Sequence, residues 1–414
     1  MKLIKHFFII LMFLLVFLSI KNYSFSDDVD CDAFINNSTE TSSVINETDL
    51  NLNSRSSIVL DRSSKKVLYG KNENNRVKMA STTKIMTSII VIENCDLNQT
   101  VIISKNAAKT GGSRVGLKVN DKITVHDLLY GLMLCSGNDA AVALAEFCSG
   151  SISNFSELMN QKAKELGLIN SHFESPHGLD SDNHYTTAYE LAILSDYALK
   201  NEIFFNIVGT KNYQITINGF PKNLSNTNEL LGNFPGIYGI KTGFTNGANR
   251  CIVTACRRDK MDIICVVLGC DTKNFRTQDS KKLINYIFQN FEYIDISKKA
   301  NEEFEIWKQN NSNNIYVYKG ISSNLKLKPS NMDNTFIPVK KKDISNINTY
   351  INISNNLRAP IYKNQVVGKL NIVSNNSSIF TLDILSDSNI EKKNLKYYFY
   401  NILKSYNKYL IFTP

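Results

Sequence analysis

The chain has 414 residues, of which 43% are hydrophobic and 21% charged, and its formal net charge is +9. This length exceeds one ordinary core and predicts two folded domains with flanking segments, and the composition excludes a chain that is disordered as a whole. The positive charge is spread along the sequence, without an arginine-rich helix, a zinc-finger motif or an RNA-binding motif. We therefore expect no nucleic-acid partner, and an anionic wall polymer or lipid surface fits the charge better.

Residues 1–26 have the pattern of a secretory signal peptide. Lys2 and Lys5 precede an uncharged apolar run at 7–20, and small residues follow. Because no clear cleavage motif follows, an uncleaved membrane anchor is the alternative. Either way we expect an exported protein that acts at the outer face of the cell membrane or in the cell wall. Residues 27–54, rich in Asn, Ser, Thr and acidic residues, predict a flexible leader.

Residues 55–293 are predicted to form one domain with strands at both ends and helices between them. Two short β-type runs around a polar turn, at 58–60 and 67–69, indicate a first hairpin, and the pattern becomes helical from Ser81. After Lys200 the pattern returns to strands, with a strong hairpin around 258–260 and a closing helix. This order predicts one antiparallel sheet with helices packed on it, in the α/β (α+β) class.

Two further segments follow this domain. Residues 294–386 show short alternating strands without a convincing helical pattern and predict a small all-β domain. Residues 387–414 form a basic amphipathic tail, with Leu395 and Phe399 on one helical face and lysines on another. Such a helix can lie in an anionic membrane surface, and its alternative is packing against the β domain.

Eight cysteines occur in the chain, and most of them are expected to be buried free thiols, including Cys135 beside Ser136. If the hairpin around residues 258–260 pairs in the matching register, Cys251 and Cys270 share one face of the sheet, as do Cys256 and Cys265. A disulfide there is disfavoured, because directly opposed strand positions strain the bond.

The first candidate catalytic pair is Ser81 with Lys84. A lysine three residues after a serine on a helix lies one turn away, where its amine can reach the hydroxyl and act as a base when it is neutral. The Ser-x-x-Lys spacing occurs four times in this chain, but only Ser81 stands at a helix start beside a strong apolar face. The free N–H groups of that helix start could also stabilise an oxyanion.

The second candidate motif is Ser136-Gly137-Asn138, in the tight connection between two predicted helices. Ser-x-Asn recurs often in so asparagine-rich a chain, and this copy differs from the others by its place in a turn. Short polar side chains in such a turn can point together into a cleft.

The triplet Lys-Thr-Gly occurs twice. Lys109 to Gly111 follows a helical pattern and ends in two glycines, which predicts a helix C-terminus. Lys241 to Gly243 instead ends a β run and precedes the hairpin, so it borders any cleft on the sheet. Gly243 would let a substrate backbone come close.

Together these three motifs resemble the signature set of the penicillin-binding proteins and serine β-lactamases. The similarity is greatest to the low-molecular-mass D-alanyl-D-alanine carboxypeptidases and covers essentially all of residues 55–293, including "SPHGLDSDNHYTTAYELAIL". The segment "LRAPIYKNQVVGKLNI" resembles the second domain of that family. The resemblance implies a β-lactamase/transpeptidase-like antiparallel sheet with flanking helices and a helical subdomain, followed by the small all-β domain.

The resemblance also implies a reaction, the removal of the terminal D-alanine from the pentapeptide stems of peptidoglycan. Ser81 would be the acylated nucleophile and Lys84 its general base. Ser136 would relay the proton to the leaving D-alanine, and Asn138 would hold the substrate amide. β-Lactam antibiotics would act as covalent inhibitors at the same serine, and the chemistry needs no metal or other cofactor.

The third motif would bind the end of the substrate. Lys241 would support the electrostatics of the proton relay, and Thr242, followed by Gly243 on the same strand, would bind the terminal carboxylate. The backbone N–H groups of Ser81 and Phe244 would form the oxyanion hole.

Two features depart from the family pattern or compete with it. Some members carry an arginine for the carboxylate upstream of the third motif, where this chain has Thr227. Arg250 is a nearby candidate for the missing cation, with an exposed strand arginine as the alternative. His177 and His184 could suggest a metal site, but no third ligand at metal spacing accompanies them.

Two rival functions use the same sequence features. A serine β-lactamase would share the three motifs but would need a fast deacylation step, for which class A enzymes use a glutamate. Glu157 follows the second motif, but its surroundings predict an ordinary helix. A non-catalytic wall-binding protein is the second alternative, and an intact set of the four residues Ser81, Lys84, Ser136 and Lys241 would be superfluous to it.

Overall fold

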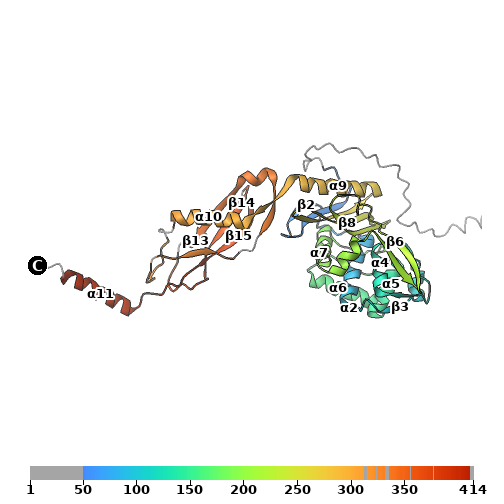
Figure 1. Cartoon of the computed structure of the whole chain (residues 1–414), viewed down its shortest axis with the longest axis horizontal. Coiled ribbons are helices and arrows are strands. Elements are labelled where there is room, and N and C mark those ends of the chain that lie inside the picture. The colour runs from blue at the N-terminus through green and yellow to red at the C-terminus, as the bar shows by residue number, and fades with distance from the viewer. Residues whose placement is uncertain are drawn as a thin grey trace, which may run out of the picture. The chain divides into compact units, whose positions relative to one another are not determined.

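The computed structural model of this chain describes residues 50–311, 315–322, 324–331, 335–354, 356–375 and 377–410. The chain divides into two compact units between Gln289 and Asn290. Figure 1 traces the elements along the chain. The signal predicted at 1–26 lies outside the described residues, as does most of the leader.

The end of the predicted leader is folded. Leu50 and Leu52 are buried, and the Ser54 N–H donates a hydrogen bond to Asp279 at 2.7 Å. The expectation of a flexible leader extending to residue 54 is therefore wrong at its C-terminal end, because these apolar side chains pack on the first unit.

The first unit is built on one antiparallel sheet of five strands in the order β2-β1-β9-β8-β7. Its first two strands come from the start of the unit and the other three from its end, as the sequence pattern predicts. The strands are β1 (Ser56–Asp61), β2 (Val67–Lys71), β7 (Ile237–Thr245), β8 (Asn249–Arg258) and β9 (Met261–Cys270).

Helices and two small two-stranded sheets occupy the middle of the unit and its C-terminal end. One sheet pairs β3 (Thr100–Ile102) with β4 (Lys122–Thr124), and the other is the hairpin of β5 (Asn212–Ile217) and β6 (Phe220–Ser225). The helices are η2 (Ala80–Thr83), α2 (Lys84–Asn94), α3 (Lys105–Lys109), α4 (Val125–Met133), α5 (Asn138–Ser149), α6 (Ile152–Glu165), α7 (Ala188–Ala198), α8 (Glu202–Gly209) and α9 (Lys273–Asn290).

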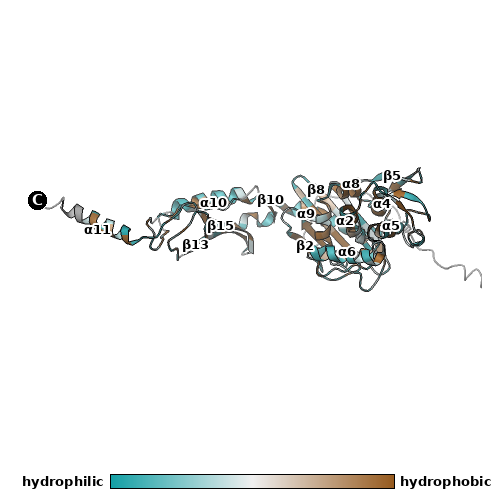
Figure 2. Ribbon diagram, turned by 90° about the horizontal axis from the view of Figure 1, so that it is seen from below, coloured by the Kyte–Doolittle hydropathy of each residue, from teal (hydrophilic) through white to brown (hydrophobic). Residues whose placement is uncertain are grey.

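Helix α2 is the centre of the helical layer. Every residue from Lys84 to Val91 is buried, and the helix contacts α4, α5, α6, α7 and α8. The periodic pattern predicts one buried face, but the polar side is enclosed too, with Thr87 Oγ1 donating to the Pro176 carbonyl at 2.6 Å. In Figure 2, hydrophobic residues gather among the helices of this unit. The helix that begins at Lys84 is therefore enclosed on all sides.

Several helices begin at a side-chain cap. Thr124 caps α4 as predicted, because its Oγ1 accepts a hydrogen bond from the Asp127 N–H at 3.1 Å. Ser104 caps α3 in the same way, and α3 ends at Lys109, as predicted for the first Lys-Thr-Gly triplet. Local side-chain chemistry thus determines where these helices begin.

The β8–β9 hairpin pairs in a different register from the one considered for disulfides. Arg258 pairs with Met261 across a two-residue turn, Cys256 lies opposite Ile263, and Cys265 lies opposite Thr254. The turn is centred one residue earlier than the disulfide register requires. The four cysteines of this hairpin are free thiols.

The second unit is a β domain that also contains one long helix. Helix α10 (Ile296–Asn311) buries Ile296, Ala300 and Phe304 against the domain core, although the sequence pattern did not predict a helix there. The strands are β10 (Phe291–Asp295), β11 (Leu327–Pro329), β12 (Phe336–Lys340), β13 (Ile347–Ile353), β14 (Val366–Ser374) and β15 (Ser377–Ser386). They form a sheet in the order β11-β15-β14-β13 and the pair β10-β12.

The tail forms helix α11 (Leu395–Leu410). Its large apolar side chains are exposed up to residue 405, including Leu395 at 90%, Phe399 at 64% and Ile402 at 65%. Both hydrophilic and hydrophobic residues line this helix in Figure 2. Within the described residues, none of the helices is long and apolar enough to cross a membrane.

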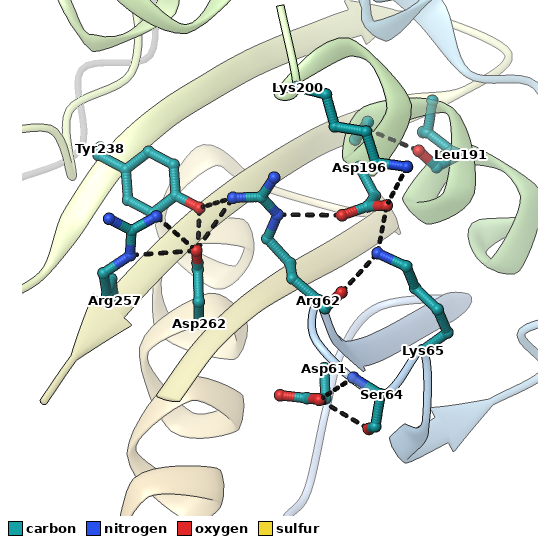
Figure 3. A network of polar contacts seen from close by, with 11 residues as sticks. Asp61, Arg62, Ser64, Lys65, Leu191, Asp196, Lys200, Tyr238, Arg257 and Asp262 are labelled. Atoms are coloured by element: carbon teal, nitrogen blue, oxygen red, sulfur yellow. Dashed lines mark hydrogen bonds and ion pairs between the residues drawn. The ribbon is translucent and has the colours of Figure 1, made fainter. Parts of the chain in front are cut away.

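A network of charged groups ties the sheet to the helical layer (Figure 3). Arg62, which follows β1, donates to Asp196 of α7 at 3.1 Å and to Asp262 of β9 at 2.9 Å. The Tyr238 hydroxyl donates to Asp262 at 2.6 Å, and Arg257 pairs with the same carboxylate at 2.7 Å. Burial and the neighbouring Asp262 carboxylate raise the pKa of Tyr238 well above its usual range.

We expect Asp262→Ala to lower the free energy of unfolding by about 3 kcal/mol, because it leaves the largely buried Arg62 guanidinium and the Tyr238 hydroxyl without their shared acceptor. Urea denaturation measures the change. Asp182→Ala is the matched control, since the Asp182 side chain is fully exposed in its ion pair with Lys78 and should change the value by less than about 1 kcal/mol. Equal effects of the two substitutions would contradict a structural role for the network.

Candidate active site

Ser81 and Lys84 meet at the junction of η2 and α2. Ser81 lies in the single turn of η2 and is 8% exposed, whereas Lys84 is the first residue of α2 and is fully buried. The Lys84 amine donates a hydrogen bond to Ser81 Oγ at 2.8 Å. The spacing of one helical turn therefore produces the contact that the sequence pattern predicts.

The Lys84 amine also contacts two other chain segments. It donates to Asn138 Oδ1 at 2.7 Å and to the His177 carbonyl at 3.0 Å. Asn138 Nδ2 in turn donates to the Gly111 carbonyl at 2.7 Å, which is consistent with the assigned orientation of the amide. The first and second motifs are thus brought together by one buried amine.

Ser136 occupies a tight turn between α4 and α5 and has a positive φ of 61°. Its hydroxyl is buried and, within the part of the chain that the structure describes, has no hydrogen-bond partner. Buried hydroxyls in proteins are usually paired, and exceptions often mark functional sites. Ser136 therefore has an unused donor and acceptor beside the Lys84 cluster.

The third motif is on β7, which lies against the turn that carries Ser81. A Cβ atom added at Gly243 would lie 2.9 Å from the Ser81 backbone nitrogen and 3.1 Å from the Ala80 Cβ. We expected Gly243 to make room for a substrate backbone, but what lies closest to it is the protein's own turn at Ala80, Ser81 and Thr82. Glycine is required there because a side chain would push strand and turn apart.

Lys241 and Thr242 are both buried on β7. The Lys241 amine donates to the Thr242 carbonyl at 3.1 Å, and the hydroxyls of Thr242 and Thr227 lie 2.8 Å apart. The Thr227 N–H donates to the Leu134 carbonyl at 3.0 Å, at the end of α4. Thr227 therefore connects the third motif to the segment that leads into Ser136.

Arg250 is 6% exposed, so the expectation of an exposed strand arginine is wrong. It pairs across the sheet with Phe244, and its guanidinium carbon lies 3.7 Å from the centre of the Phe244 ring. Stacking on the ring stabilises the cation and fixes its position beside the third motif.

The two histidines considered for a metal site have separate contacts. His177 supplies its carbonyl to Lys84, and the His184 ring contacts Thr83 Oγ1 at 2.8 Å. Burial and the charge of Lys84 lower the pKa of His177 to about 3, and burial lowers the pKa of His184 to about 4. Across the described ranges, no group of three or more His, Cys, Asp or Glu side chains is arranged to hold a metal ion.

Three contributors to the site were missed by the sequence analysis. The carbonyls of Gly111 and His177 accept the hydrogen bonds given above. Asp180 accepts from Thr245 Oγ1 at 2.7 Å and from the Gly247 N–H at 2.8 Å, which joins the loop that carries His177 to the end of β7. Backbone carbonyls have no residue-type signature, so no sequence pattern could have identified the first two.

The arrangement as a whole suits nucleophilic chemistry. A serine hydroxyl in hydrogen-bond contact with a lysine amine can attack an electrophilic carbon while the amine accepts its proton. The hydroxyl of Ser136, unpaired within the described residues, and strand β7 belong to the segments packed around this serine–lysine pair. This geometry is of the kind found in the class of enzymes that form a covalent intermediate on serine.

Comparison with known proteins agrees with this class. Residues 42–272 match the D-alanyl-D-alanine carboxypeptidase model of peptidase family S11, and residues 301–392 match the C-terminal domain of penicillin-binding protein 5. The chain is 35% identical to the D-alanyl-D-alanine carboxypeptidase DacF of Bacillus subtilis, over 76% of this chain and 80% of DacF. It is 33% identical to DacC of Escherichia coli, over 82% of this chain and 85% of DacC.

Solved structures give the same result. Penicillin-binding protein 5 of Haemophilus influenzae is 29% identical and matches with a TM-score of 0.66, over 82% of this chain and 98% of that protein. DacD of Francisella tularensis is 26% identical and matches with a TM-score of 0.68, over 87% of this chain and all of that protein. The chain belongs to the D-alanyl-D-alanine carboxypeptidase family, peptidase family S11.

We expect Gly243→Ala to destabilise the first unit by about 1–3 kcal/mol, because the added methyl group would meet the Ser81 backbone nitrogen at 2.9 Å. Gly111→Ala is the matched control, since nothing lies within 4 Å of the added atom there, and it should change the free energy of unfolding by less than about 0.5 kcal/mol. Urea denaturation measures both. If the two variants were equally stable, β7 would not be packed against the turn that carries Ser81 as described.

Proposed function

We propose that this protein is a serine-type D-Ala-D-Ala carboxypeptidase, which removes the terminal D-alanine from peptidoglycan stem peptides and is acylated by penicillin. The hydrogen bond of 2.8 Å from the buried Lys84 amine to Ser81 Oγ is the observation that carries the proposal. Family membership supplies the substrate class. Ser81 attacks the carbonyl of the last peptide bond, D-alanine leaves, and water releases the shortened peptide.

The first two motifs carry the proton transfers in this proposal. In its neutral form Lys84 donates its two hydrogens to Asn138 Oδ1 and the His177 carbonyl, and its lone pair faces Ser81 Oγ and accepts the proton of that hydroxyl. Ser136 passes a proton to the leaving D-alanine. The hydroxyl of Ser136 supports this role, since within the described residues its donor and acceptor are not taken up by another hydrogen bond. Asn138 holds the substrate amide while its own side chain stays oriented by Lys84 and the Gly111 carbonyl.

The third motif binds the end of the substrate. Thr242 contacts the terminal carboxylate, and Lys241 supports the proton relay electrostatically. The N–H groups of Ser81 and Phe244 form the oxyanion hole, which the close approach at Gly243 supports. Arg250 completes carboxylate binding, because it is the cation stacked on Phe244 beside this strand.

The proposed architecture and location follow the sequence. Residues 1–26 serve as a signal peptide, 27–49 as a leader, 55–293 as the catalytic domain and 294–386 as the β domain. The curated relatives are D-alanyl-D-alanine carboxypeptidases by name, and the proposed peptidoglycan substrate supports action outside the cytoplasm. The reaction as proposed requires no cofactor.

A β-lactamase remains the main alternative, with the same acylation step. Class A β-lactamases deacylate through a water held by a glutamate. The Glu157 side chain is exposed on the regular helix α6, whereas such a role requires a buried glutamate. This position favours the carboxypeptidase.

The purified mature protein should release D-alanine from a peptide that ends in D-Ala-D-Ala and gain the mass of one penicillin on Ser81. Ser81→Ala should lose more than about 1,000-fold in rate, because it removes the nucleophile. Ser88→Ala is the matched control on the same buried stretch of α2 and should keep the activity. Mass spectrometry and a D-alanine assay measure the two outcomes.

Three results would redirect this assignment. Rapid penicillin turnover without release of D-alanine would indicate a β-lactamase. A folded protein that gives neither an adduct nor D-alanine would indicate a non-catalytic wall-binding protein. Activity that survives Ser81→Ala would contradict the mechanism itself.

The exposed apolar face of α11 supports a second part of the proposal, attachment of the tail to an anionic membrane surface. Full-length mature protein should co-sediment with vesicles that contain phosphatidylglycerol, and a chain ending at Asn394 should stay in solution with its enzymatic activity intact. Phe399→Ser with Leu403→Ser should weaken binding about tenfold or more, whereas Asn401→Ser should not. Equal sedimentation of all variants would exclude the tail as the anchor.

A further inference from the structure

Ala80, directly before the nucleophile, has an unusual backbone conformation. Its φ is +49°, a region that residues with a side chain seldom occupy without support from their surroundings. The Thr83 hydroxyl donates to the Ala80 carbonyl at 2.8 Å. A Cβ at Gly178 would lie 2.0 Å from that carbonyl oxygen, so the loop that carries Gly178 also presses on this turn.

The Thr83 hydroxyl has a second partner, the His184 ring. Thr83 Oγ1 and His184 Nε2 are 2.8 Å apart, and the Glu174 N–H donates to His184 Nδ1 at 3.0 Å. Because Nδ1 accepts a hydrogen bond, the ring proton must be on Nε2, and His184 is the donor to Thr83. Donation therefore runs in one direction, from the Glu174 N–H through His184 and Thr83 to the Ala80 carbonyl.

The position of His184 is well defined. The residue is 2% exposed, and its ring stands edge-on to Phe173 at 5.8 Å. The loop that carries it closes through the backbone bridge between His172 and Tyr185. No titration of this ring is expected at neutral pH, since burial disfavours its charged form.

We propose that His184 is a positioning residue for acylation, which acts through Thr83 to hold Ala80 in its left-handed conformation and so maintains the contact between Ser81 and Lys84. Thr83 is the residue directly before Lys84, so movement of its hydroxyl displaces both ends of the catalytic pair. The hydrogen bonds of His184 join it to Thr83 and Glu174, so it acts on the catalytic pair through Thr83. The inference rests on the proposed role of Ser81 as nucleophile.

The proposal has a consequence for pH dependence. The charged or titratable groups around His184 are Glu174, Asp180, His172 and His177, and burial lowers the pKa of His184 to about 4. Protonation places a hydrogen on Nδ1, which then faces the Glu174 N–H and loses that hydrogen bond. Because the folded pKa lies below the unfolded value of about 6.5, this stabilisation is complete above pH 6.5 and is lost as the pH falls through about 4.

The test measures the second-order rate constant for acylation by a fluorescent penicillin between pH 3.5 and 8. It compares the wild-type protein with three single variants. His184→Ala should lower the rate about 10- to 100-fold at pH 7. His184→Gln should recover most of it, because the amide can donate to Thr83 and accept from Glu174, and should remove the part of the acid limb centred near pH 4. Thr83→Val should lower the rate to a similar extent.

Two further variants sharpen the result. The double variant His184→Ala with Thr83→Val should be no slower than either single variant, because both substitutions break the same chain of hydrogen bonds. His172→Ala is the matched control in the same loop, since its ring contacts the Asn183 carbonyl and not the nucleophile turn. It should keep the wild-type rate at pH 7, and its acid limb should move to slightly higher pH, because the charge of His172 no longer lowers the pKa of His184.

The outcomes separate the inference from the function on which it rests. A wild-type protein that takes up no penicillin would overturn both. If the wild-type protein is acylated and His184→Ala is acylated at the same rate, only the positioning role would be overturned. The same conclusion would follow if His184→Ala failed to fold while Thr83→Val and His184→Gln both kept the wild-type rate and acid limb.

Discussion

The structure of the site depends on the hydrogen bonds of one buried amine. Lys84 Nζ donates to Ser81 Oγ, Asn138 Oδ1 and the His177 carbonyl, which belong to three separate segments of the chain. A buried amine without acceptors would carry a large desolvation penalty. The start of α5 and the loop before α7 must therefore stay packed on α2, and the enclosed position of α2 follows from this requirement.

The chain segments around Lys84 can pack this closely only because glycines, which have no side chain, stand where the segments come nearest to one another. Gly178 meets the Ala80 carbonyl, Gly243 meets the Ser81 nitrogen, and a Cβ at Gly112 would lie 2.5 Å from Asn138 Nδ2. Each of these glycines lies on a different segment around the Ser81–Lys84 pair. The site is thus assembled from backbone packed closely around one serine and one lysine, and positive φ values at Ala80 and Ser136 belong to the same geometry.

Features that depend on local chemistry were predictable from the sequence. The helix start at Ser81, the Thr124 cap and the strand position of Lys241 all follow from residue types within one or two turns of the chain. Features that depend on distant backbone were not predictable, such as the carbonyl of His177. The pairing register of β8 and β9 could not be predicted from the alternation of residues alone, because Cys256 faces the same side of the sheet whether it lies opposite Cys265 or Ile263. Face alternation constrains register only to steps of two residues.

The two Lys-Thr-Gly triplets show how identical letters contribute to one site in different ways. Lys241 is 1% exposed on β7, where the strand directs its side chain inward, whereas Lys109 is exposed at the end of α3. Yet the first triplet also reaches the site, because Gly111 lies in the loop that follows α3 and its carbonyl accepts from Asn138. A loop after a helix can present a backbone carbonyl and a strand presents alternating side chains, so the local fold decides which atoms of a motif can act. The copy that composition alone would dismiss orients the side chain of the second motif.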